Sequence, residues 1–221
     1  MGTDIQIYPE QRVNGRWQFI GEMIKNVSYQ YDPEHEPPYH PKDLYDIRNY
    51  GLFAILVDVR NDEGYECIAT RRGIPDDLSS EIKSYFESFQ SNKSNITWLS
   101  PDEKQRASWI AYDTDMEIHP SWLTLEELVN FAWHEKRIQI YAKVDKRVAH
   151  LFHPERDFPF REWPAGIQCG YSTTFKEDPY CNASWTQTYE EAAGSDFMEL
   201  LDTFSQQYGP SKDVRFVFWF I

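Results

Sequence analysis

The first residues of this chain whose types and spacing could do chemistry share one predicted strand. Asp4, Tyr8, Glu10 and Arg12 alternate along the segment DIQIYPEQR, so they lie on one face of an extended strand. Neighbouring side chains on a strand face lie roughly 7 Å apart, and two carboxylates at that spacing could share a metal ion or act as acid and base across a bond. An ordinary solvated strand face would show the same pattern, so both interpretations stay open.

The hairpin that this strand opens brings aromatic rings to the same face. The Asn-Gly pair at residues 14–15 favours the positive φ angles of a type I′ turn. This turn places Trp17 and Phe19 beside Glu10, while the opposite face is aliphatic. Large aromatic rings seldom line a fully exposed sheet surface, so we expect the charged face to line an enclosed cleft.

Two further segments carry arginines that could recognise a phosphate or a carboxylate. The Arg-Asn-Tyr sequence at residues 48–50 lies near an expected helix N-terminus, which suits such anions. Arg71 and Arg72 stand beside a flexible glycine and could form the one basic pocket of an acidic protein. The alternative, that they pair with the aspartates at residues 76–77, stays open.

Other polar motifs carry weaker chemical signals. His119 precedes Ser121, but no G-x-S-x-G motif accompanies this pair. The acidic run at residues 113–117 lacks the glycine and the terminal glutamate of an EF-hand loop. The histidines within residues 150–153 fit a helix face better than a zinc site. Neither of these spacings assigns a metal site. We also find no P-loop and no G-x-G-x-x-G fingerprint, so the sequence leaves the cofactor unknown.

Composition limits the partners and the compartment. The chain has 221 residues and a formal net charge of −14, which argues against a long nucleic acid as partner. Its three cysteines are widely spaced and form no C-x-x-C pair, so a reducing cytoplasm is the simplest location. No window approaches the ~18 apolar residues that a membrane span needs, so no membrane partner is expected.

Hydrophobic periodicity predicts the elements that must position these residues. Ser79 is the expected N-cap of one helix, Thr124 with Glu127 forms a capping box for another, and Ser195 is expected to cap a third. The expected helices lie, in chain order, within residues 42–61, 78–89, 124–136, 138–153 and 195–208, and a short strand is expected at 108–112.

The two ends of the chain define the expected fold. The apolar run at residues 213–221 is typical of a central strand that is buried on both faces. We therefore expect one α+β domain over residues 1–221, with a mixed or antiparallel sheet, an N-terminal hairpin and helices packed on the sheet. Residues 154–189 are expected to form an irregular, aromatic-rich insertion.

Several segments resemble an uncharacterised family of bacteriophage and prophage proteins. The opening MGTDIQ is similar to an M-G-x-D-I-H motif, and RNYGLFAILVDVR, RGIPDD-LS, SWLTLEEL and VRFVFWF follow in the order of that family. Gln6 replaces the histidine that often follows Asp-Ile in the family. An amide cannot act as a general base and is a poor ligand for transition metals, which weakens a metal-hydrolase interpretation.

The resemblance implies a protein of the host cytoplasm, and it extends the set of candidate residues. Carried over by position, the polar set of the family falls on Asp4, Glu10, Arg48, Asn49, Arg71, Asp76, Ser121 and Trp122. Aromatic rings would stack on a base while arginines contact phosphates. The residues expected to bind such a ligand are Gln6, Tyr8, Trp17, Arg48, Asn49, Tyr50, Arg71, Arg72, Asp76, Ser121 and Trp122.

Three functions follow as hypotheses. The first is a phage protein that binds a small phosphorylated or nucleotide-like molecule and so sequesters a host defence signal. The second is a hydrolase of a similar ligand, with Glu10 or Asp4 as general base and His119 as acid. The third is an acidic inhibitor that binds a host protein without a small-molecule site. A homo-oligomer is compatible with each of them.

Overall fold

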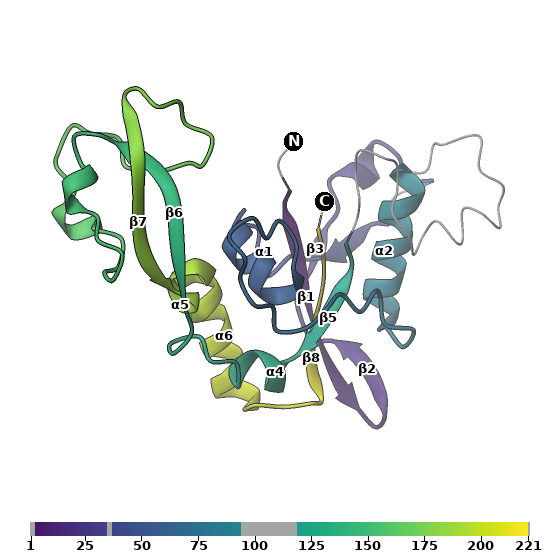
Figure 1. Ribbon diagram of the computed structural model, residues 1–221. Helices are drawn as coiled ribbons and strands as arrows, with labels where there is room; N and C mark the ends of the chain where they lie inside the picture. Colours follow the sequence, from purple (N-terminus) through teal and green to yellow (C-terminus); the bar gives the residue numbers. More distant parts are fainter. Residues whose placement is uncertain (1–2, 35–36, 94–118, 221) are drawn as a thin grey trace.

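The structure is a computed structural model that describes residues 3–34, 37–93 and 119–220 (Figure 1). Its strands are β1 (Ile5–Val13), β2 (Arg16–Phe19), β3 (Met23–Lys25), β4 (Tyr39–Pro41), β5 (Ser121–Thr124), β6 (Arg137–Asp145), β7 (Tyr180–Thr188) and β8 (Val214–Phe220). Its α-helices are α1 (Tyr50–Val57), α2 (Ser80–Lys93), α4 (Leu125–Val129), α5 (Tyr189–Ala193) and α6 (Ser195–Tyr208). Short 3-10 helices lie at Ser28–Gln30, Ala149–Leu151 and Phe160–Glu162.

A four-stranded antiparallel sheet forms the centre of the molecule, in the order β2-β1-β8-β5. The predicted hairpin is confirmed: Glu10 pairs with Phe19, and the turn residues Asn14 and Gly15 have φ angles of 52° and 78°. The predicted central position of the C-terminal strand is also confirmed, since every residue of β8 is buried. The α+β class is therefore as expected.

Both faces of this sheet are covered, which explains the uniformly apolar sequence of β8. On one face Ile5 and Ile7 pack in a core with α1, α5 and α6. On the other face Tyr8 and Trp219 pack against α2, where the Phe86 ring lies 5.0 Å from the Trp219 ring. Figure 1 shows α1 and α2 on opposite sides of β1 and β8.

Helix α1 covers only residues 50–57 of the expected span of 42–61, so that prediction is wrong for residues 42–49 and 58–61. Asn49 is extended and caps the helix, because its Oδ1 accepts a hydrogen bond from the backbone N–H of Leu52 at 3.0 Å. Gly51 allows α1 to approach α5, since a Cβ at this position would lie 2.9 Å from the carbonyl oxygen of Ala192.

The expected capping residues have three different outcomes. The Thr124–Glu127 box is confirmed at α4. Ser79 lies at the expected N-cap position directly before α2, and its carbonyl accepts the N–H of Lys83 at 3.0 Å, but its buried Oγ has no hydrogen-bond partner among the described residues, so it caps no N–H with its side chain. At α6 the N-cap is Gly194 rather than Ser195. A second capping box, formed by Thr188 and Glu191 at α5, was not predicted.

The region after α4 differs most from expectation. Instead of a helix over 138–153, residues 137–145 form β6, which pairs with β7 from the segment expected to be irregular. We call residues 136–188 the arm; Figure 1 shows its two long strands standing to one side of the central sheet. Rings from this segment pack against one another, namely Phe152, Phe158, Trp163, Tyr171 and Trp185, and Trp185 also belongs to the main core cluster.

Two expectations have no structural test. The strand expected at 108–112 lies outside the described residues, and the single domain over residues 1–221 stays a prediction. Within the described ranges, no helix has the length and apolar character required to cross a bilayer.

Candidate functional site

The centre of the hairpin's charged face, around Glu10, is buried by a salt-bridged network rather than open as a cleft, whereas Asp4 and Arg12 at its ends are about half exposed. Glu10 has an exposed fraction of 0%. Its Oε2 accepts a hydrogen bond from Nε of Arg215 at 2.7 Å, and its Oε1 accepts one from the backbone N–H of Ser79 at 2.7 Å. The expectation that Glu10 acts as a general base is corrected, because both carboxylate oxygens are engaged and neither meets solvent.

Arg215, the second residue of β8, organises this network. Its guanidinium donates to Asp77 at 2.9 Å and lies 3.9 Å from the ring centre of Trp17. The indole Nε1 of Trp17 donates to the same carboxylate at 3.0 Å. Burial alone would raise the pKa of Asp77, but the hydrogen bond and charge of Arg215 hold it below its ordinary value. A lone arginine in an apolar run is the sequence signal for this network, because a buried cation needs a carboxylate.

Tyr8 and Gln6 fill space that a ligand was expected to occupy. The Tyr8 ring lies 4.8 Å from the Trp219 ring, and the indole N–H of Trp219 donates to Oε1 of Gln6 at 2.7 Å. Burial raises the pKa of Tyr8 well above its ordinary range. The cleft expected on this face is therefore filled by α2 and by the protein's own side chains.

The second group of candidate residues lies at the start of α1. Arg48 donates two hydrogen bonds of 2.8 Å to the carboxylate of Asp4, and both side chains are about half exposed. The hydrogen bond from Arg48 lowers the pKa of Asp4. Asn49 uses its Nδ2 to bond the carbonyl of Ala193 at 2.8 Å, and the Tyr50 hydroxyl accepts the backbone N–H of Thr3 at 3.3 Å. Polar atoms of these residues are thus engaged within the protein.

The third group surrounds Arg72. Its guanidinium pairs with both carboxylate oxygens of Glu127 and lies 4.7 Å from the ring centre of Trp122. The backbone N–H of Arg72 donates to Oγ of the buried Ser121 at 3.1 Å. The Arg72 hydrogen bond lowers the pKa of Glu127 to about 2. Arg72 therefore pairs with Glu127 instead of the aspartates at 76–77.

The remaining candidates lie at the surface near this group. Arg71 is hydrogen-bonded to the ring of His119, and Asp76 is exposed. The fold therefore brings Trp17 and Trp122 together around Arg215, whose guanidinium lies 5.6 Å from the second ring.

Metal ligands do not gather in the described ranges, where no group of three or more His, Cys, Asp or Glu side chains could hold an ion. The acidic run at 113–117 lies outside those ranges.

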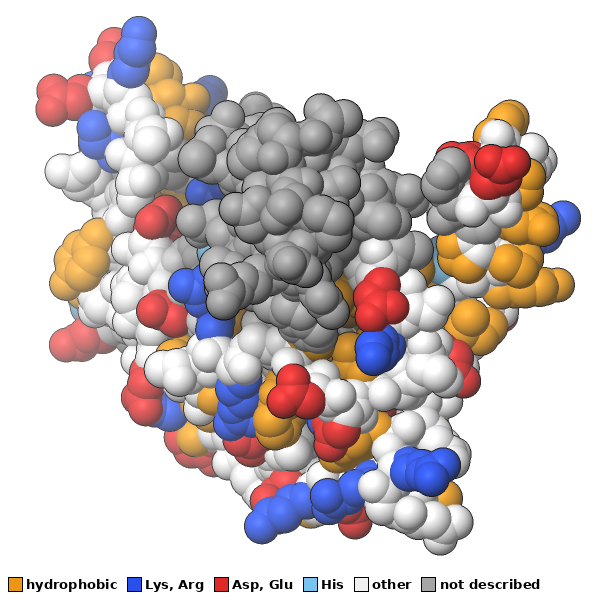
Figure 2. All heavy atoms as spheres, turned by 90° about the vertical axis from the view of Figure 1, so that its right-hand side faces the viewer, with side chains coloured by type: hydrophobic (Ala, Val, Ile, Leu, Met, Phe, Trp, Pro, Cys, Tyr) orange, Lys and Arg blue, Asp and Glu red, His pale blue; other side chains and the backbone are white. Residues whose placement is uncertain are grey.

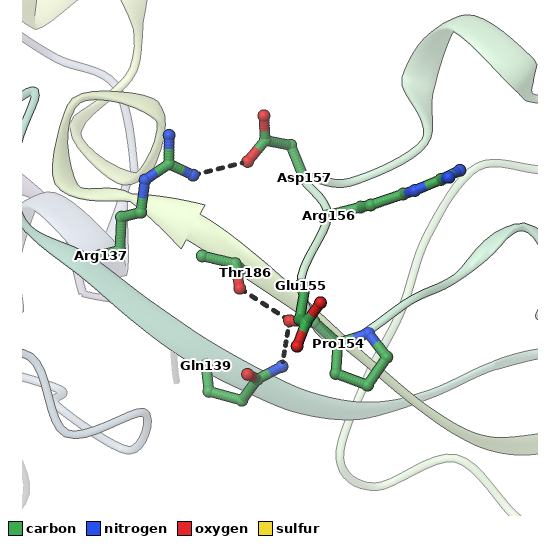
Figure 3. A pocket seen from close by; sticks show the side chains of 7 residues that line it. All are labelled: Arg137, Gln139, Pro154, Glu155, Arg156, Asp157 and Thr186. Carbon is green, nitrogen blue, oxygen red and sulfur yellow. Dashed lines mark hydrogen bonds and ion pairs between the residues drawn. The ribbon is translucent and has the colours of Figure 1, made fainter.

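A shallow pocket of about 640 Å³ lies on the arm, and the sequence did not suggest it (Figure 3). Its walls are tied together: Pro154 O accepts hydrogen bonds from Gln139 at 2.9 Å and Thr186 at 2.7 Å, and Arg137 pairs with Asp157 at 3.0 Å. The side chain of Arg156 points away from it in Figure 3. The polar groups drawn toward the centre of this pocket thus hold the 154–157 segment in place.

A second unpredicted feature is an exposed hydrophobic surface on residues 22–34 and 37–41, which we call the tyrosine lobe. Val27, Tyr31 and Tyr39 have exposed fractions of 68%, 81% and 57%, and Met23 and Tyr29 are also exposed. Figure 2 shows hydrophobic side chains gathered on the projecting lobe at its upper right. The inner side of the lobe is anchored, since the His40 ring stacks on Tyr85 of α2 at 5.3 Å.

Ion pairing neutralises most of the cations that could have met a phosphate. Among the described residues, pairs join Arg12 to Asp213, Lys42 to Glu22, Arg48 to Asp4, Arg72 to Glu127, Lys136 to Glu66, Arg137 to Asp157, Lys146 to Asp178, Arg147 to Asp145, Lys212 to Glu126, and Arg215 to Glu10 and Asp77. Because the chain has 36 acidic and only 22 basic residues, its net charge stays negative whichever of them are paired. Comparisons of the chain with family models, with curated proteins and with solved structures gave no match.

Proposed function

We propose that this protein is an acidic binding protein that docks through its tyrosine lobe onto another protein. The observation that carries the proposal is the exposure of large hydrophobic side chains on one small unit, with Tyr31 at 81% and Val27 at 68%. Large contiguous apolar patches are rare on monomers, and those that occur mark interaction surfaces.

The composition of the lobe suits a protein interface. Tyrosine and methionine are enriched at interfaces, and tyrosine supplies a large contact area at a low cost in conformational entropy. Prolines at positions 33, 37, 38 and 41 restrict the backbone of the same segment. A restricted segment loses less entropy on binding, which favours affinity.

Charge selects the class of partner. Residues 22–41 contain four acidic residues and one lysine, and the whole chain carries −14. Complementary charge steers association and excludes partners of like sign. The proposed partner therefore presents an apolar patch with a basic rim.

The other two hypotheses have less geometric support and stay predictions. A nucleotide-like ligand needs unpaired cations beside exposed rings, whereas Arg48 and Arg72 are ion-paired and Trp17 is covered by Arg215. A hydrolase needs an accessible base, and Glu10 is fully buried. The resemblance to phage proteins makes a protein of the bacterial cytoplasm the first partner to test, with inhibition of a host defence as the outcome.

The test compares tyrosines of similar exposure on two surfaces. Tagged wild-type protein, Tyr31→Ser and Tyr141→Ser are passed through bacterial lysate; Tyr141 is 71% exposed on the arm and serves as the matched control. We expect one protein to bind the wild type and Tyr141→Ser but not Tyr31→Ser. With that protein purified, Tyr31→Ser should weaken the Kd at least about tenfold. Equal binding by both variants would refute docking through the lobe.

A nucleotide panel tests the first hypothesis directly. Cyclic and linear nucleotides are added to the purified protein, and the Tm and the bound fraction are measured. We expect no shift, whereas a retained intact nucleotide would favour the small-molecule hypothesis and a consumed one the hydrolase.

A further inference from the structure

Strand β6 of the arm has an outer edge that its own chain closes only at one end. At Lys143 the edge is closed, because this residue exchanges two backbone hydrogen bonds with Ser172, at 3.0 and 3.2 Å. Backbone groups of successive strand residues point alternately to the two neighbouring strands. Those of Arg137, Gln139 and Tyr141 therefore point to the same side as Lys143, away from β7. Among the described residues no backbone hydrogen bond reaches these three residues on that side.

The residues along this open edge are suited to pairing with another strand. Tyr141 is 71% exposed, and Arg137 is exposed as well. The five residues at 138–142, IQIYA, contain no charge and no proline, and the strand to which they belong is nine residues long. Natural proteins protect edge strands by prolines, inward-pointing charges, bulges or short length, and an unprotected edge is a template for another strand. An extended strand is therefore the kind of partner that this edge fits.

The opposite edge of the same two-stranded ribbon is covered. The backbone N–H of Thr186 in β7 donates to the carbonyl of Arg156 at 2.8 Å. The hydroxyl of Thr186 and the amide of Gln139 both bond the carbonyl of Pro154, which holds this covering segment in place. A strand added to the arm is thereby directed to β6 rather than to β7.

We propose that residues 137–141 of β6 pair antiparallel with the same residues of a second copy of this chain, so that two arms form one four-stranded sheet in a closed dimer. The surface lies on the arm, whereas the proposed docking surface for another protein is the tyrosine lobe. Neither proposal depends on the other.

The edge is complementary to itself in hydrogen bonding and in charge. About a two-fold axis at Gln139, Arg137 of each copy lies opposite Tyr141 of the other, so each copy supplies the backbone donors and acceptors that the other needs. This register places no like charges opposite one another, and it brings a guanidinium beside an exposed ring. It also leaves Lys143, where Ser172 closes the edge, outside the pairing.

The distribution of charge along the chain favours the arm as the contact between copies. Residues 136–188 contain eight basic and six acidic residues, a net charge of +2, whereas the rest of the chain carries −16. Contact between the acidic remainders of two copies would meet strong repulsion, and contact between two nearly neutral arms meets little. Because each whole copy is still negative, added salt should strengthen this dimer.

Sedimentation equilibrium of the full chain over a wide range of protein concentration tests the dimer. We expect a monomer–dimer equilibrium without larger species. Tyr141→Pro removes an outward N–H but no hydrogen bond to β7, and proline is tolerated at the edge of a sheet. It should weaken the dimer Kd at least about tenfold, because two-fold symmetry doubles the loss. Tyr141→Ser retains the N–H and is the matched control, with a smaller effect from the loss of the ring.

Hydrogen exchange of the wild type, measured residue by residue, provides a second readout that needs no variant. The amides of Arg137, Gln139 and Tyr141 should be protected at high protein concentration and exchange faster at low concentration. Those of Ile138 and Ile140 point to β7 and should be protected at both. If Tyr141→Pro does not fold, this difference between alternate residues decides the question.

Four results would overturn the proposal. The first is a monomer at every concentration, and the second is a dimer that Tyr141→Pro leaves intact. The third is a series of larger species that dissociate in added NaCl, which would indicate contact between the arm of one copy and the acidic remainder of the next. The fourth is dissociation of the dimer by Tyr31→Ser, which would place self-association on the tyrosine lobe.

Discussion

At the scale of single residues, Arg215 explains why Glu10 of the first hairpin is buried. A buried guanidinium in β8 requires carboxylates, and Glu10 and Asp77 supply them. The ring of Trp17 then covers the cation at 3.9 Å. Glu10 and Trp17, which share a face by strand alternation, thus take part in one ion-paired network around Arg215.

This network predicts a large effect of one truncation. Glu10→Ala leaves Arg215 buried without its closest carboxylate, so the free energy of unfolding should fall by roughly 3–5 kcal/mol. Urea unfolding monitored by tryptophan fluorescence measures the change. Asp4→Ala is the matched control, because it removes a carboxylate that also pairs with an arginine but is half exposed. A similar effect of both variants would contradict the structural role of Glu10.

Acid stability provides a second prediction at this scale. The pKa of Glu127 is lowered to about 2 by the hydrogen bond from Arg72, so its folded value lies below its unfolded value. Its contribution to stability is present above about pH 4.5 and is lost as the pH falls toward 2. Glu127→Gln should therefore lose less stability than the wild type between pH 5 and pH 2 in Tm measurements. Glu126→Gln, at the neighbouring position, should follow the wild type.

At the scale of elements, the contact between α1 and α5 decides where the first helix can lie. Its one glycine, Gly51, faces the backbone of Ala192. The helix is otherwise uniformly apolar and six of its eight residues are buried, so packing rather than amphipathic pattern holds it in place.

Gly51→Ala tests this contact because two effects compete. Alanine favours a helix over glycine by about 1 kcal/mol, but the added Cβ would lie 2.9 Å from a backbone oxygen that cannot rotate away. We expect a net destabilisation of about 1–3 kcal/mol in urea unfolding. Gln206→Ala in α6 is the control at an exposed helix position and should change little. A stabilised Gly51→Ala variant would show that α5 yields to the new methyl group.

At the scale of the whole molecule, the charge distribution governs stability and association. The described ion pairs are mostly at the surface, where each contributes little to stability. The net charge of −14 means that the excess acidic side chains repel one another throughout the fold. Screening by salt should therefore stabilise the protein as a whole.

A salt series checks this balance. At pH 7 the Tm should rise by several degrees between low salt and 0.5 M NaCl, because added ions screen the repulsion. Sucrose at a matched osmolality controls for general solvent effects. A Tm that falls with NaCl would mean that the surface ion pairs outweigh the repulsion between like charges.

The sequence predicted an element correctly where the residues that determine it lie within one short segment. The Asn-Gly turn fixed the hairpin register, and Thr124 with Glu127 marked the start of α4. The prediction of a helix over 138–153 was wrong, because a short apolar run does not distinguish a strand from a helix. The strand that pairs with residues 137–145 begins 35 residues after that segment ends, so no local pattern shows the pairing. The charged face of the hairpin was predicted as a site because nothing local reveals that α2 covers it.

The sequence by itself determined the α+β class, the N-terminal hairpin and the central place of the last strand, because turn geometry and hydrophobic burial act through neighbouring residues. Only the tertiary structure decided which charges are paired, which rings are covered and that the tyrosine lobe remains exposed. Burial and ion pairing depend on segments far apart in the chain, such as Glu10 and Arg215, whose contact no local pattern encodes.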